Sequence, residues 1–118
     1  MFPIQPWKPR DATDHIRSMA RSPDLSIAYR LHARERLLHR GIITSDVLFV
    51  LKYGFVHTEP EPSTRDGFYR YAIDNKTPNS DSRDIRLIIV PDPMKMMIKI
   101  VTVMWVDEAS TKAGSILR

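Results

Sequence analysis

The fold of this chain is decided by the stretch Met97-Ile98-Lys99-Ile100-Val101-Thr102-Val103-Met104-Trp105-Val106. Its β-branched and apolar residues predict a β-strand over residues 97–106. Strict alternation places Thr102 on the face of Ile98 and Ile100, with Lys99 on the opposite face. A strand this apolar would be an aggregation hazard at an exposed edge, so we expect it to be central or covered.

Three further strands are predicted upstream of this stretch, at residues 55–58, 68–74 and 85–90. Polar loops rich in turn residues separate them, and Pro91-Asp92-Pro93 predicts the turn before the last strand. The loops are too short for parallel crossover connections. The second half of the chain therefore predicts a four-stranded antiparallel sheet.

The first half of the chain has the period of helices. The segment from Ser26 to Gly41 is the most helical, and its apolar side is expected to carry Leu31, Ala33, Leu37 and Leu38. The opposite side is expected to carry His32, Arg36 and His39, with Arg40 alongside. A second helix is predicted from an N-cap at Thr44 or Ser45 to Gly54, with Asp46 in its first turn and a buried face of Val47, Leu48, Val50 and Leu51.

The N-terminal residues predict a separate arm. Prolines at positions 3, 6 and 9 favour an extended segment over residues 1–12, and Phe2, Ile4 and Trp7 suggest that it packs against another surface and does not move freely. A short helix is expected from Thr13 or Asp14 to Arg21. We therefore divide the chain into an arm with a short helix (1–24), an α+β domain of helices packed on a four-stranded antiparallel sheet (25–108), and a tail (109–118).

The composition limits the classes of function. A chain of 118 residues fits one domain, and a formal net charge of +4 favours anionic partners such as nucleic acid. The chain has no cysteine, which excludes disulfides and thiolate metal sites. It has no apolar run long enough for a membrane span and no signal-peptide pattern, so we expect a cytoplasmic protein with no membrane partner.

Familiar catalytic motifs are absent from the sequence. It contains neither a glycine-rich phosphate loop nor a His-Glu-x-x-His pair, and the four histidines do not have recognised metal-ligand spacing. We therefore expect no metal and no cofactor.

The residues of most chemical interest begin at His32. His32 and Arg36 are four positions apart, so their side chains share one face of the predicted helix. Cleavage of RNA without a metal needs a base, an acid and cations for the charge on phosphorus, and histidine beside arginine can supply these groups. A solvated helix face with i,i+4 pairs explains the same pattern.

The predicted strands carry further polar candidates for a functional site, and each also has a purely structural explanation. Arg86 alternates onto the face of Ile88 and Val90, where an arginine needs a partner or a wet cleft. Arg70 lies between Tyr69 and Tyr71, which suggests a basic and aromatic platform for a base or a phosphate. Half-buried tyrosines on an edge strand, and a threonine that merely packs at position 102, are the structural alternatives.

Most of these residues belong to a pattern that resembles a known protein family. The pattern His32-Ala33-x-Glu35-Arg36-x-x-x-Arg40-Gly41-Ile42, followed by Asp46-Val47 and Gly54, resembles the opening of the family called domain of unknown function 4258. The strands at Phe68-Tyr69-x-Tyr71, Ile85–Ile89 and Ile100–Val103 fit as well, so the resemblance covers residues 27–106. It implies a fold like that of RelE and barnase ribonucleases and a toxin-type RNase. Carried over by position, it points to His32, Arg36, Arg40, Arg86 and Thr102.

The hypothesis that follows is a metal-independent endoribonuclease acting on RNA, with a cognate antitoxin protein as a second partner. His32 would be the acid or base, Arg36 and Arg86 would stabilise the phosphoryl transition state, and Thr102 would support the site. Arg40, Arg70, Tyr69 and Tyr71 would bind RNA. Two alternatives stay open. One is a protein-interaction module that uses the N-terminal arm, and the other is a nucleic-acid binder without catalysis.

Overall fold

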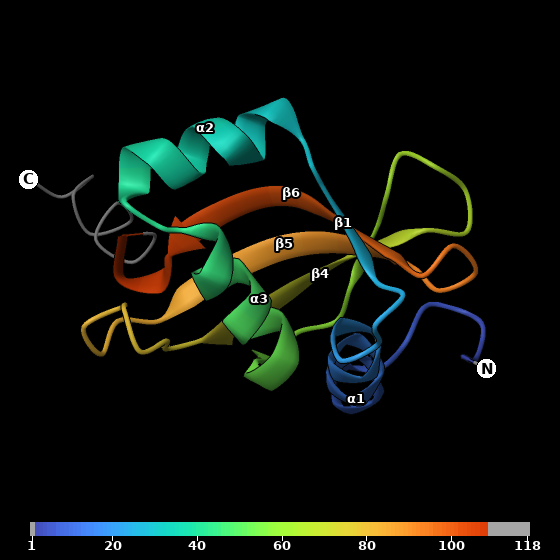
Figure 1. Ribbon diagram of the computed structural model, residues 1–118. Coiled ribbons are helices and arrows are strands. Elements are labelled where there is room, and N and C mark those ends of the chain that lie inside the picture. The colour runs from blue at the N-terminus through green and yellow to red at the C-terminus, as the bar shows by residue number, and fades with distance from the viewer. Residues whose placement is uncertain (1, 109–118) are drawn as a thin grey trace, which may run out of the picture.

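The computed structural model describes residues 2–108 and contains three helices and six strands over that range (Figure 1). In chain order the elements are α1 (Pro9–Ala20), β1 (Ser26–Tyr29), α2 (Leu31–Arg40), α3 (Thr44–Tyr53), β2 (Phe55–Val56), β3 (Glu61–Pro62), β4 (Tyr69–Asn75), β5 (Ile85–Asp92) and β6 (Met97–Trp105). Residues 106–108 are also helical. The expected tail, residues 109–118, lies outside the described residues.

The strands form one sheet in the order β1-β6-β5-β4-β2, with β3 paired to β4. The β2, β4, β5 and β6 strands correspond to the four predicted from the sequence, and they pair antiparallel. The α+β class is therefore confirmed. The strand count was wrong, because β3 and β1 were missed. The β1 strand runs parallel to β6, with Ser26 opposite Met97 and Tyr29 opposite Ile100.

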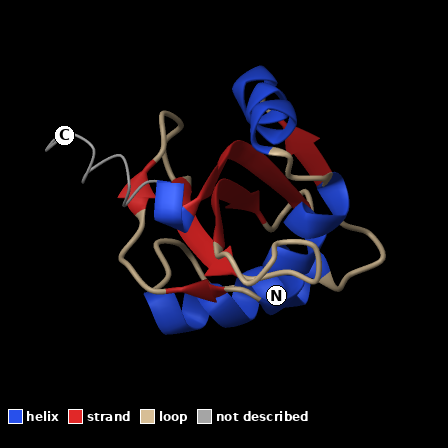
Figure 2. Ribbon diagram, turned by 90° about the vertical axis from the view of Figure 1, so that its left-hand side faces the viewer, coloured by secondary structure: helices blue, strands red, loops and turns tan. Residues whose placement is uncertain are grey.

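One face of the sheet holds the core, and all three helices contribute to it. The buried cluster joins Ile16 of α1, Leu37 of α2 and Leu51 of α3 to Ile89 and Ile100 of the central strands. Figure 2 shows the helices around one side of the curved sheet. We call the other side, which carries Arg86, Ile88, Lys99 and Thr102, the open face.

A β-bulge in β6 corrects the predicted placement of Thr102. Ile88 pairs with Thr102, but the next residue, Ile89, pairs with Ile100, so Val101 is an extra residue in β6. Ile98, Ile100 and Val103 are all buried as a result. Strict alternation had put Thr102 on the face of Ile98 and Ile100. The bulge moves it to the opposite, open face, beside Ile88.

The α2 helix is shorter than predicted and turned differently. Residues 26–29 form β1 because they pair with the edge of β6, and the helix begins at Leu31. Its buried residues are Ala33 and Leu37, whereas Leu31 and Leu38 are 75% and 85% exposed. The predicted apolar side was therefore only half right. Gly41 ends the helix in the left-handed conformation, as expected.

The N-terminal arm is packed on the domain, as its apolar side chains suggested. Trp7 is 3% exposed, and its backbone N–H donates to the hydroxyl of Tyr71 at 3.0 Å. The α1 helix begins at Pro9, earlier than the predicted Thr13 or Asp14, because proline fits the first helical position, where the missing N–H has no helical partner. The Thr13 hydroxyl instead donates to the Pro9 carbonyl and accepts from the N–H of Val56.

The α3 helix is fixed at both ends by polar side chains. At its start, the Asp46 carboxylate accepts from the Ile43 N–H at 3.1 Å and from the Thr77 hydroxyl at 2.7 Å. At its end, Arg17 of α1 donates to the carbonyls of Tyr53 and Gly54, and Arg21 donates to that of Lys52. The predicted caps Thr44 and Ser45 lie inside the first turn, because Ile43 is the N-cap residue.

We predict that Asp46→Ala lowers the free energy of unfolding by about 2 kcal/mol, because it leaves the part-buried Ile43 N–H and the buried Thr77 hydroxyl without their charged acceptor. Urea unfolding followed by circular dichroism measures the change. Asp66→Ala, which removes an exposed carboxylate, is the control and should change the stability little. Equal stability of the two variants would contradict the structural role of Asp46.

We also predict that Gly54→Ala destabilises the protein more than Gly41→Ala. A Cβ at Gly54 would collide with the Val50 carbonyl and lie 2.7 Å from Ile73 Cγ1, so we expect a cost of about 2–3 kcal/mol. Gly41 has φ +65° and open space around it, so alanine there costs only backbone strain, about 1 kcal/mol. Thermal unfolding of both variants tests this order, and the reverse order would show that Gly54 is not tightly packed.

Candidate functional site

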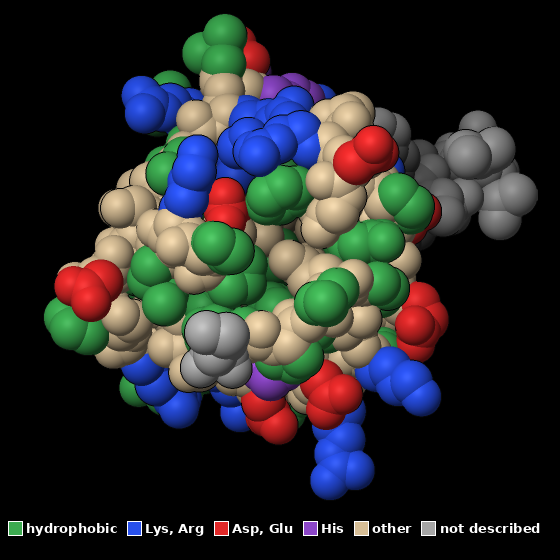
Figure 3. Space-filling model, turned by 90° about the vertical axis from the view of Figure 1, so that its right-hand side faces the viewer, with side chains coloured by type: hydrophobic (Ala, Val, Ile, Leu, Met, Phe, Trp, Pro, Cys, Tyr) green, Lys and Arg blue, Asp and Glu red, His purple; other side chains and the backbone are tan. Residues whose placement is uncertain are grey.

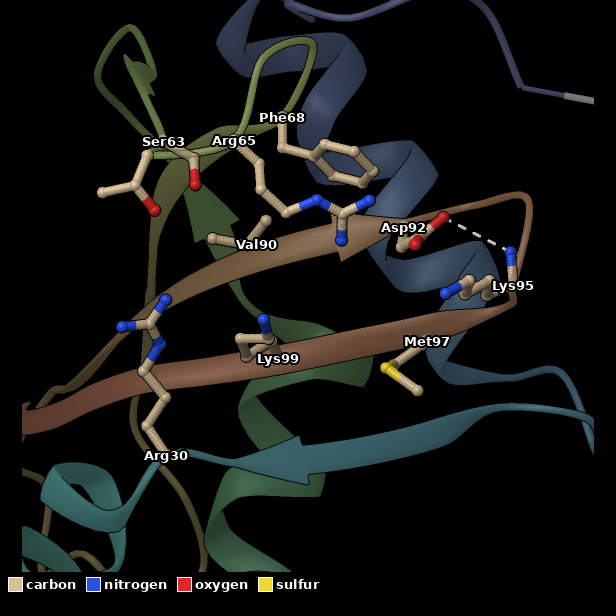
Figure 4. A pocket seen from close by; sticks show the side chains of 10 residues that line it. Arg30, Ser63, Arg65, Phe68, Val90, Asp92, Lys95, Met97 and Lys99 are labelled. Carbon is tan, nitrogen blue, oxygen red and sulfur yellow. Dashed lines mark hydrogen bonds between the residues drawn. The ribbon is translucent and has the colours of Figure 1, made fainter.

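The open face carries a basic hollow at the end of the sheet near the β5–β6 turn. It measures about 200 Å³ and is lined by Arg30, Ser63, Thr64, Arg65, Phe68, Val90, Asp92, Lys95, Met97 and Lys99. Figure 4 shows Arg30, Arg65 and Lys99 reaching into the same space from three separate segments, with the helices behind the sheet. The hollow is smaller than the usual 300–1,000 Å³ of small-molecule pockets, which suits a single compact group such as a phosphate.

Arg30 and Lys99 are held by the regular backbone of the sheet. The Arg30 N–H donates to the Ile100 carbonyl at 3.0 Å, which fixes Arg30 at the junction of β1 and α2. Lys99 lies between two buried residues, Ile98 and Ile100, so alternation directs its half-buried side chain to the open face. Both cations are therefore placed by strand geometry.

Arg65 and Phe68 come from the loop between β3 and β4. The loop is closed by a hydrogen bond of 2.8 Å from the Ser63 N–H to the Phe68 carbonyl, and Gly67 takes a φ of +83° that favours glycine. The Arg65 guanidinium lies 4.1 Å from the centre of the Phe68 ring. This cation–π contact orients the arginine without neutralising its charge.

The β5–β6 turn borders the hollow at the end of the sheet. Its Asp92 carboxylate accepts from the backbone N–H of Lys95 at 3.3 Å (Figure 4). The Lys95 side chain does not take part in this bond and is exposed. Asp92 is the one acidic residue in the lining, against four cationic ones. The hollow is thus strongly positive.

The cations of the hollow differ from most arginines that sequence reasoning selected. Among residues 2–108, Arg30, Arg65, Lys95 and Lys99 form no ion pair with a carboxylate, whereas Arg40, Arg70 and Arg86 each form one. Figure 3 shows lysine and arginine side chains gathered on the upper part of the face that it presents. Unpaired cations held close together repel one another, so an anion that binds among them gains more than at a paired site.

His32 and Arg36 are adjacent, as their spacing predicted. Arg36 Nε donates to His32 Nε2 at 3.2 Å on the exposed side of α2. Neither residue lines the basic hollow. The pair therefore places an imidazole beside a guanidinium charge on the exposed surface of α2.

Arg40 and Arg86 are each held by a carboxylate. Arg40 Nε lies 2.6 Å from Glu108 Oε1, and hydrogen bonds from Arg40 hold the pKa of Glu108 below its usual value. Arg86 donates two hydrogen bonds of 2.8 Å to Asp74, and these bonds raise the pKa of Arg86 above its usual value. The partner that Arg86 was expected to need is thus Asp74, on the neighbouring strand.

The remaining candidates lie in three different environments. Thr102 is on the open face opposite Ile88, two residue pairs along the strands from Arg86. Arg70 is 3.4 Å from Glu61 and lines a second hollow, next to the basic one. Tyr69 is partly buried against the core, and Tyr71 is fully buried, so the Tyr71 ring has no exposed face for a base. Burial also raises the pKa of Tyr71 to about 12.

Sequence reasoning missed most of the hollow. Arg30 was assigned to a helix, and Arg65 and Lys95 fall in a loop and a turn without periodicity. Lys99 gave the one usable signal, since a lysine within an apolar strand must face solvent or a polar partner. Alternation had already placed it away from Ile98 and Ile100.

Residues 2–108 contain neither a membrane-spanning helix nor a cluster of metal-binding side chains. Over that range the structure holds no helix long and apolar enough to cross a membrane. In the same residues, no three histidine or acidic side chains come together as a metal site would require.

Comparison with known proteins gives one match. No curated protein and no solved structure matches the chain. The sequence model of the family described as Domain of unknown function (DUF4258) matches residues 29–105, which span β1 to the end of β6 apart from the first three residues of β1. This match covers well over half of the chain, so the protein belongs to the DUF4258 family.

Proposed function

We propose that this protein binds the phosphate backbone of single-stranded RNA on its open face. The observation that carries the proposal is the group of four cations around the basic hollow, none of which is paired with a carboxylate within residues 2–108. Neutralising phosphates with lysine and arginine releases condensed counterions, and this release supplies most of the affinity of such binding.

The shape of the site supports a flexible strand as the ligand. A second hollow shares Arg30, Ser63 and Thr64 with the first and extends toward Arg70. The Phe68 ring at the rim adds an aromatic surface, and proteins that bind single strands combine such surfaces with cationic grooves. A strand can follow the two hollows across the sheet.

The architecture supports a finer proposal about ancestry. The helices cover one face of an antiparallel sheet, and the other face carries the basic residues. We propose that this arrangement is a variant of the RelE and barnase type of ribonuclease fold, extended by the parallel strand β1. RNA is the ligand that this relation favours.

We predict that Arg65→Gln/Lys99→Gln weakens binding of a single-stranded RNA at least about tenfold and lowers the slope of log affinity against log salt by about 1.4, since each phosphate contact on a single strand contributes about 0.7. Fluorescence anisotropy with a labelled oligoribonucleotide over a salt series measures both quantities.

Lys52→Gln/Lys76→Gln is the matched control, because it removes the same charge from residues outside both hollows. A single-stranded DNA of the same sequence tests the preference for RNA. Equal losses in the two double variants would show that net charge, and not the hollow, drives binding.

Cleavage of RNA is the second candidate function, and the His32–Arg36 pair favours it. His32 would take the proton of a 2′-hydroxyl, whose oxygen attacks phosphorus. The 5′-oxygen would leave with a proton from an acid, giving a 2′,3′-cyclic phosphate. Arg86 could stabilise the transition state only by sharing its hydrogen bonds with Asp74, and Arg40 could bind the RNA backbone only by sharing its own with Glu108. The structure therefore supports binding better than cleavage.

The second candidate predicts that the wild-type chain, induced in bacteria, arrests growth and cleaves RNA, and that His32→Ala abolishes both effects. His39→Ala, on the same helix, is the control and should behave as the wild type. Growth curves and RNA gels with all three chains test this. Intact RNA with the wild type would leave the binding function alone, and cleavage by His32→Ala would remove His32 from the mechanism.

A further inference from the structure

We infer that the basic hollow receives the terminal phosphate of an RNA strand, a phosphomonoester, in preference to an internal phosphodiester. This inference rests on the proposed RNA binding and names the group that the site selects. Three features of the hollow carry it: the number of unpaired cations, its position beside the β5–β6 turn at one end of the open face, and the distribution of acidic residues along the path that leads to it.

The four positive charges around the hollow outnumber the single negative charge of a phosphodiester. Arg30, Arg65 and Lys99 reach into the space from the β1–α2 junction, the β3–β4 loop and β6, and Lys95 adds a fourth positive charge (Figure 4). A diester has one negative charge and two free oxygens. A monoester has up to two charges and three free oxygens, so it can accept from a separate donor at each oxygen.

The hollow lies at one end of a path over the open face. The second hollow continues from Arg30 toward Arg70 and Val101, and a third, beyond Arg70, reaches Ala72 and Ile88. On its other side the basic hollow meets the β5–β6 turn at Asp92 and Lys95. A strand that follows this path comes to its end among the cations.

Acidic residues along the path also favour binding of the phosphate in the basic hollow. Glu61 pairs with Arg70, and Glu59 and Glu61 line the third hollow. Backbone phosphates are therefore held weakly there, because the cation is already shared with a carboxylate. The unpaired charge is concentrated at the end of the path beside the β5–β6 turn, where a terminal phosphate would be.

The test compares three oligoribonucleotides of one sequence: one with a 5′-phosphate, one with a 3′-phosphate and one with hydroxyls at both ends. Each carries its fluorophore on an internal base, and anisotropy at fixed salt gives the affinity. We expect one phosphorylated form to bind about tenfold more tightly than the hydroxyl form, since its terminal phosphate places up to two charges among the cations, where the hydroxyl form can offer only the single charge of an internal diester. The tighter form identifies which end enters the hollow.

Variants show whether the preference arises in the hollow. Lys99→Gln should reduce the tenfold preference to about twofold or less, while Lys76→Gln should leave it unchanged. Should Lys99→Gln fail to fold, Arg65→Gln replaces it, because Arg65 is an exposed loop side chain. A preference that persists in the hollow variants would overturn the inference.

The two proposals fail differently. Equal binding of the three oligonucleotides would overturn the terminal-phosphate inference and leave RNA binding intact. Absence of binding by all three would overturn both.

Discussion

The pairing of β5 with β6 is the interaction on which the rest of the structure depends. These two strands are central to the sheet and share a long antiparallel register, from Ile85 opposite Trp105 to Asp92 opposite Met97. The register contains one interruption, at Val101. Without it, Ile98 and Val103 would face opposite sides, and one of them would lose its place in the core. The bulge therefore lets a single strand bury both ends on one side while keeping Lys99 and Thr102 on the other.

Charge is distributed over this scaffold in two ways. Arg40, Arg83 and Arg86 close hydrogen-bonded pairs with carboxylates that are distant in sequence, and these pairs tie α2 and the sheet strands to neighbouring segments. The arginines and lysines around the hollow instead come from a strand end, a loop, a turn and the interior of β6. The first group contributes to the fold. The second group is left available to an anion. The candidate site is therefore built by these four segments and not by α2, the helix with the most arginines.

Local periodicity explains what could be predicted from the sequence. The four antiparallel strands, the helix that ends at Gly54, and the contact of the proline arm with the domain all follow from patterns within about ten residues. The β1 strand could not be predicted, since its four residues become a strand only by pairing with β6, far along the chain. The bulge was equally hidden, because Val101 looks like any other residue of an alternating strand. The ion pairs of Arg40 with Glu108 and of Arg86 with Asp74 could not be predicted either. The sequence shows which residues are charged, but the tertiary structure decides which of them meet.

The hydrogen bonds from α1 to the end of α3 separate two boundaries that are often taken as the same. The family match begins at residue 29, yet Arg17 and Arg21 supply the donors for the last carbonyls of α3, and Trp7 covers Tyr71. A shortened chain that begins at residue 29 would lack α1, so the part of the core that packs against Ile16 would be exposed. The carbonyls of Lys52, Tyr53 and Gly54 would also lose their guanidinium partners. The segment that the family model matches is thus smaller than the packed unit of this structure, whose core also includes α1 and the N-terminal arm.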